Sequence, residues 1–172
     1  MSLSEITTDV SERISMDITE LDRVLGGGLV KGSLVLVGGE PGIGKSTLLM
    51  QVCQNVSGKG KILYVSGEES EMQLKRAERL SVTGENLLIL PETDIDKALS
   101  FVDETGCDVC IIDSVQTMFS ESVDSTGGSV GQIRDVTMKI MRKAKESGCA
   151  FFIVGHVTKD GNIAGPRMLA HM

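Results

Sequence analysis

Short apolar runs alternate along the chain with segments whose apolar residues recur every three or four positions. The runs predict strands and the spaced segments predict helices. The predicted strands cover residues 33–38, 61–66, 87–90, 109–113 and 150–155, and the predicted helices cover 44–57, 70–81, 94–105 and 129–147. This alternation is typical of an α/β fold, with a mostly parallel sheet and helices on both faces. We expect one such domain over residues 16–172, preceded by a flexible segment over residues 1–15.

The predicted helix 129–147 has one apolar stripe that is expected to face the sheet. The stripe consists of Val130, Ile133, Thr137, Ile140, Met141 and Ala144. The cations of this helix fall elsewhere on it: Arg134, Lys139, Arg142, Lys143 and Lys145. A solvated helix surface is the default interpretation of these cations, and a DNA-binding role is the alternative. Asp94 is expected to be the N-cap of the helix that follows it.

Composition fits one globular domain, since 41% of the 172 residues are hydrophobic. The formal net charge of −7 argues against a generally polycationic nucleic-acid binder, so a polyanion would have to meet a local basic surface. No apolar run approaches the ~18 residues that a membrane helix needs, and the N-terminus shows no signal-peptide pattern. We expect a cytoplasmic protein without a membrane partner.

The four cysteines lie in apolar or strand-like surroundings rather than in turn-rich segments. Cys107 and Cys110 match the C-x-x-C pattern, but no second pair follows at the spacing of a zinc ribbon. Small buried hydrophobic residues are therefore the favoured interpretation, and redox or metal chemistry is the alternative.

A glycine-rich turn joins the first long predicted strand to a helix, with the sequence "GGEPGIGKST". Gly39-x-x-x-x-Gly44-Lys45-Ser46 is the complete P-loop pattern in its required strand-turn-helix context. Backbone N–H groups of such a loop surround the phosphates of ATP, Lys45 supplies a positive charge, and Ser46 offers a hydroxyl to Mg²⁺. A purely structural glycine turn is the alternative. The expected nucleotide-binding residues are Gly39, Glu40, Pro41, Gly42, Ile43, Gly44, Lys45, Ser46 and Thr47.

Acidic residues follow two other predicted strands. Asp113 ends the apolar run "VCIID" and is the candidate Walker B ligand of Mg²⁺, although an acid at a strand end can also be a simple terminus. Glu68 and Glu69 follow "ILYVSG", where one of them could orient the attacking water. Glu68 is the first choice for this base and Glu69 the second. Solvated loop acids are the alternative interpretation.

The last predicted strand carries His156 at its end, where an imidazole could sense the γ-phosphate or simply cap the strand. Two glycine-rich stretches, 121–132 and 157–172, also follow strands. In open α/β sheets the loops after the carboxyl ends of the strands line the ligand crevice, so these stretches are the places to expect partner contacts.

Four stretches together carry a resemblance to a known family. They are "LDRVLGGGLVKGSLVLVGGEPGIGKSTLL", "YVSGEES", "IIDSVQT" and "GHVTKDGNIAGPRMLAHM". The chain beyond residue 15 resembles the RecA-type ATPase domain of the bacterial RadA (Sms) family of DNA repair proteins. The resemblance implies a RecA-like P-loop NTPase fold and Mg²⁺-dependent ATP hydrolysis, with Lys45, Ser46, Asp113 and Glu68 at the reaction and His156 as sensor.

The resemblance also implies partners. Family members act in recombination as ring-shaped homo-oligomers, expected to be hexamers, on single-stranded DNA and branched intermediates, together with a RecA-type recombinase. Lys159, Asn162 and Arg167 occupy the second glycine-rich stretch and are implied DNA contacts. One or two cations per subunit bind DNA weakly, and a ring multiplies them.

Family members also carry a four-cysteine zinc module before this region, and a Lys-Asn-Arg-Phe-Gly motif and a Lon-like domain after it. We therefore expect this chain to be a C-terminally incomplete ATPase core with slow turnover. One alternative function is a KaiC-like module in which ATP organises a ring without DNA translocation. A small-molecule kinase is a weaker alternative, because no arginine-rich lid is evident.

Overall fold

The computed structural model describes residues 13–15, 19–39, 45–56, 58–67, 86–124 and 129–156. Five strands form one parallel sheet: β3 (Leu34–Gly39), β4 (Ile62–Ser66), β5 (Leu87–Pro91), β6 (Val109–Asp113) and β7 (Ala150–His156). Their order across the sheet is β3-β7-β6-β4-β5. The α/β class and the parallel sheet are confirmed, and each predicted strand ends within one residue of the observed one.

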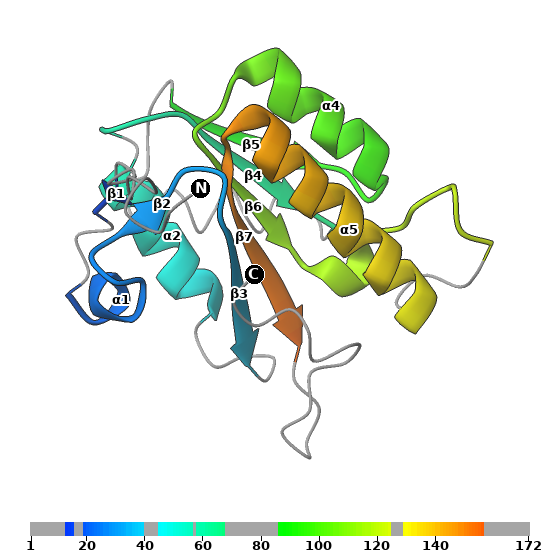
Figure 1. Cartoon of the computed structure of the whole chain (residues 1–172), viewed down its shortest axis with the longest axis horizontal. Coiled ribbons are helices and arrows are strands. Elements are labelled where there is room, and N and C mark those ends of the chain that lie inside the picture. The colour runs from blue at the N-terminus through cyan, green and yellow to red at the C-terminus, as the bar shows by residue number, and fades with distance from the viewer. Residues whose placement is uncertain are drawn as a thin grey trace, which may run out of the picture.

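Helices cover both faces of this sheet (Figure 1). On one face lie α4 (Ile95–Thr105) and α5 (Val130–Ser147), side by side. The other face is covered by α2 (Lys45–Val56), together with α1 (Thr19–Val24). The predicted helix over 70–81 lies outside the described residues.

Four short elements were not predicted from the sequence. They are α1, a two-stranded antiparallel sheet of β1 (Arg13–Ile14) and β2 (Leu29–Val30), and the 3-10 helix η2 (Val115–Thr117). Each is too short to produce a clear period of two or 3.6 residues. The β1 strand falls within the segment 1–15 expected to be flexible, whose residues 1–12 lie outside the described residues.

The core forms two apolar layers because consecutive strand residues point to opposite faces. On the α5 side the prediction for helix 129–147 needs two corrections. Val130 is 54% exposed, whereas Val136 is fully buried. Val130 is the first residue of α5. Ile133, Thr137, Ile140 and Ala144 are buried as predicted.

Caps fix where the two outer helices begin and end. Asp94 is confirmed as the N-cap of α4, because its Oδ1 accepts a hydrogen bond from the Asp96 amide at 2.9 Å. Gly106 ends α4 and Gly148 ends α5, each in the left-handed conformation that favours glycine. These caps turn the chain directly into β6 and β7.

Candidate functional site

The carboxyl ends of the central strands meet at one edge of the sheet. In the strand register Gly39 is opposite His156, Val154 is opposite Asp113, and Asp113 is opposite Ser66. After β5 the chain returns across the sheet, so that β6 and β7 lie between β4 and β3. Open α/β sheets bind ligands outside the carboxyl ends of their strands. The sequence therefore brings the P-loop strand, the Walker B candidate and the sensor candidate to the same edge.

Residues of the predicted P-loop fall partly within the described structure. Gly39 ends β3, and Lys45, Ser46 and Thr47 form the first turn of α2. Residues 40–44 lie outside the described residues. The first turn of the 12-residue α2 contains no acidic residue, so no side-chain carboxylate of that turn opposes an anion at the positive end of the helix dipole. A strand that is separated by five residues from the start of such a helix fits a bound triphosphate.

Asp113 lies on the α2 face of β6, because Ile111 and Val109, two and four residues earlier, belong to the core layer on that face. Its side chain is largely buried at 7% exposure. The hydroxyl of Tyr64 donates a hydrogen bond to Asp113 Oδ2 at 2.6 Å. Oδ1 receives no hydrogen bond from the described residues. A buried carboxylate with one oxygen held by a hydrogen-bond donor fits a hard cation such as Mg²⁺.

Tyr64 is a site residue that the sequence pattern did not identify. It is the one tyrosine of the chain and stands in an otherwise aliphatic strand, where it is fully buried. A buried tyrosine hydroxyl usually finds a hydrogen-bond partner, and that was the available signal. The identity of the partner depends on β4 lying beside β6, which the local pattern does not encode.

The segment that carries Glu68 leaves β4 next to Asp113. The amide of Gly67 donates to the Asp113 carbonyl at 3.0 Å. A Cβ placed on Gly67 would overlap the side chain of Thr117, which is part of η2. Gly67 is therefore required for the close approach of this segment to the turn after Asp113. Glu68 and Glu69 themselves lie outside the described residues.

The turn after β6 is tied to α5 by Gln132. Its Oε1 accepts from the Ser120 amide at 2.8 Å, and its Nε2 donates to the carbonyls of Ser120 and Val123 at 3.2 and 2.9 Å. Gln132 is only 3% exposed. These bonds hold the first part of the glycine-rich stretch 121–132 against the helix that follows it. Gln132 was not identified from the sequence.

The remaining predicted site residues are only partly placed. His156 is the last residue of β7, opposite Gly39 in the register. Lys159, Asn162 and Arg167 lie outside the described residues. Their roles stay predictions.

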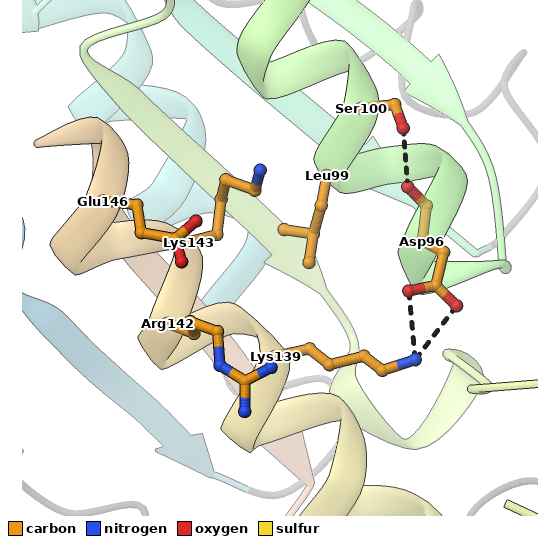
Figure 2. A pocket seen from close by; sticks show the side chains of 7 residues that line it. All are labelled: Asp96, Leu99, Ser100, Lys139, Arg142, Lys143 and Glu146. Carbon is orange, nitrogen blue, oxygen red and sulfur yellow. Dashed lines mark hydrogen bonds and ion pairs between the residues drawn. The ribbon is translucent and has the colours of Figure 1, made fainter. Parts of the chain in front are cut away.

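A separate groove of about 330 Å³ lies between α4 and α5, on the other face of the sheet from Asp113 (Figure 2). Lys139 pairs with Asp96 at 3.0 Å at its margin. Further along α5, Lys143 pairs with Asp103 at 2.6 Å. These pairs agree with the solvated-surface interpretation of the α5 cations. They contribute little stability because exposed ion pairs are worth about 0–1 kcal/mol.

The described residues contain no further candidate for a metal site. No group of three or more His, Cys, Asp or Glu side chains there is arranged to hold a metal ion. Within the same residues, no helix has the length and apolar character needed to cross a membrane.

Comparison with known proteins defines the class. A family model described as an AAA domain matches residues 2–162, so the chain belongs to that family. Together with the parallel sheet, in which β3 ends at Gly39 and α2 begins at Lys45, this match makes the chain a RecA-like P-loop NTPase domain.

Its similar proteins are DNA repair proteins named RadA. The chain is 51% identical to RadA of Listeria monocytogenes, 49% identical to RadA of Bacillus subtilis and 48% identical to RadA of Pseudomonas aeruginosa. Each match covers 99% of this chain and 38% of the relative. The chain thus spans well under half the length of these relatives, and the resemblance inferred from the motifs is confirmed.

Proposed function

We propose that this chain binds ATP with Mg²⁺ at the carboxyl edge of its sheet and hydrolyses it as the motor domain of a DNA repair ATPase. The observation that carries the proposal is the convergence of Gly39, the start of α2 and the buried Asp113 at one edge. The identity of about half the residues to the RadA proteins supports the link to DNA repair.

Each residue has a distinct role in this proposal. The backbone amides of residues 39–44 and the first turn of α2 hold the phosphates, and Lys45 neutralises charge on them. Ser46 and Asp113 hold Mg²⁺, which, when bound, lowers the negative charge that builds up on the transferred phosphoryl group. Tyr64 keeps the Asp113 carboxylate in one orientation by donating to Oδ2.

The acid that orients the attacking water is Glu68, with Glu69 as second choice. The contact of Gly67 with η2 supports this assignment, because it starts the segment beside Asp113. His156 is the sensor of the γ-phosphate. The position of its backbone opposite Gly39 supports that role.

The coupling partner is single-stranded DNA, including branched recombination intermediates. Lys159, Asn162 and Arg167 contact it from the stretch after β7, in a ring of subunits that also works with a RecA-type recombinase. The similar proteins are DNA repair proteins, which supports this choice over a KaiC-like assembly module.

ATP hydrolysis by the chain, measured with and without single-stranded DNA, tests the proposal. Lys45→Ala is expected to lose nucleotide binding, and Glu68→Gln is expected to bind a fluorescent ATP analogue normally but lose turnover. If Glu68→Gln hydrolyses ATP at the wild-type rate, the base is misassigned. If single-stranded DNA changes the ATP hydrolysis rate neither of this chain nor of a full-length RadA relative, the KaiC-like assembly module becomes the favoured function.

A further inference from the structure

Two cysteines from distant parts of the sequence meet at the amino end of the sheet, away from the nucleotide edge. The Sγ atoms of Cys107 and Cys149 lie 3.6 Å apart, although the residues are 42 positions apart in the chain. Each follows the glycine that ends a helix, Gly106 for α4 and Gly148 for α5. The neighbouring strands β6 and β7 therefore bring together the carboxyl ends of the two outer helices.

The local chemistry distinguishes the two thiols. The hydrogen bond that Cys107 shares with Cys149 lowers the pKa of Cys107 against the opposing effect of burial. The same bond raises the pKa of Cys149, and burial adds to this rise. Cys107 is also the more accessible of the two, at 6% exposure against 1%. Cys107 is thus the thiol that ionises first, and the thiolate is the reactive form.

We propose that Cys107 and Cys149 are an oxidation site for hydroperoxides, at which a reversible disulfide joins the ends of α4 and α5. The Cys107 thiolate attacks one peroxide oxygen, the O–O bond breaks, and the departing hydroxide takes a proton to become water. The Cys149 sulfur then attacks the sulfenic sulfur of Cys107, and the S–O bond breaks. The second hydroxide leaves as water with the Cys149 proton. Two thiols lose two electrons, and one hydrogen peroxide gains them.

The remaining geometry is compatible with this bond. Forming the bond shortens the Sγ–Sγ separation from 3.6 Å to the disulfide length of about 2.05 Å. A disulfide between these positions closes a loop that contains β6, η2 and α5, so it restricts the unfolded chain and stabilises the fold. In a reducing compartment the pair stays as thiols until an oxidant appears.

Two other cysteines serve as internal controls. Cys110 is buried on the same face of the sheet as the pair, and Cys53 is buried on the α2 face. Burial raises the pKa of Cys53 to about 12 and that of Cys110 well above its ordinary value. Neither is therefore expected to react at neutral pH.

The test treats the folded, reduced chain with hydrogen peroxide, blocks the remaining thiols under denaturing conditions, and maps disulfides by mass spectrometry without reduction. We expect two of the four thiols to disappear, one linked peptide pair that contains Cys107 and Cys149, and a rise in melting temperature that dithiothreitol reverses. Cys53→Ser should keep the linked pair, whereas Cys149→Ser should leave Cys107 as a sulfenic acid that dimedone captures.

Three outcomes overturn the proposal, and all of them can be read on the wild-type chain even if a variant fails to fold. The first is retention of four thiols under peroxide that oxidises free cysteine in the same buffer. The second is a linked pair that includes Cys110 or Cys53, and the third is a disulfide between two chains.

Discussion

Tyr64 on β4 and Asp113 on β6 are joined by a 2.6 Å hydrogen bond inside the core layer that α2 covers. The phenol donates and the carboxylate accepts, so the bond is charge-assisted and orients the acid that we assign to Mg²⁺. This bond connects the packing of the sheet to the proposed chemistry.

Tyr64→Phe is the direct test of that connection. The variant keeps the ring and its packing but leaves a buried carboxylate oxygen without its donor, at a cost of about 1–3 kcal/mol. We expect a lower free energy of unfolding in urea. We also expect Mg²⁺ to strengthen nucleotide binding less than it does in the wild type. A cycle with Asp113→Asn should show coupling between the two positions. If the losses in free energy of unfolding of the two single variants simply add in the double variant, the hydrogen bond does not couple the two positions.

Gly67→Ala tests the close approach between β4 and η2. Its added methyl group would overlap Thr117, and overpacking of this kind costs about 1–3 kcal/mol. Because Glu68 follows directly, we expect ATP turnover to fall more than ATP binding. Gly58→Ala is a matched control, since a Cβ there meets no atom within 4 Å. Similar turnover in the two variants would contradict this account.

Gln132→Ala tests the anchoring of the turn after β6. The variant removes three hydrogen bonds to Ser120 and Val123 and leaves the buried amide and carbonyl of Ser120 without these partners. We expect a loss of about 1–3 kcal/mol in the free energy of unfolding and a smaller effect of single-stranded DNA on turnover. Met138→Ala, on the same helix at 53% exposure, is the control and should change neither. If Gln132→Ala has the same free energy of unfolding as the wild type, these hydrogen bonds do not hold the turn.

Asp135 gives a pH-dependent prediction. The hydroxyl of Ser120, with further help from Ser122 and Lys139, lowers the pKa of the Asp135 carboxyl below its ordinary value of 3.8. A depressed pKa contributes stability above the ordinary value, and this contribution is lost as the pH falls through the folded-state value. In urea unfolding, Asp135→Asn should be less stable than the wild type near neutral pH, and the gap should narrow in acid. A gap that widened as the pH fell would reverse the assigned sign.

The sequence predicted the elements well because their signals are local. The apolar run ending at Asp113, the Asp94 cap and the strand-turn-helix around Gly39 each lie within a few neighbouring residues. The strand order could not be predicted in this way, because the last strand, β7, lies between β3 and β6, which are distant from each other in the sequence. Contacts across that order, such as Cys107 with Cys149, have no local signature.

The same distinction applies to the site. Asp113 could be selected because an acid ends an apolar strand, and its position at the edge with Gly39 followed from the parallel sheet. Tyr64 and Gln132 could not be assigned their partners, because each acts across elements that are distant in the sequence. The exposed Val130 was misassigned because the helical period of apolar residues includes the first residue of α5, which is not buried in the fold.

The most direct test of the central claim is a crystal structure of the chain with Mg²⁺ and a non-hydrolysable ATP analogue. The account predicts the triphosphate between Gly39 and the start of α2, with Mg²⁺ held by Ser46 and by Asp113 directly or through one water. A nucleotide bound at another surface, with Asp113 remote from its phosphates, would contradict the account.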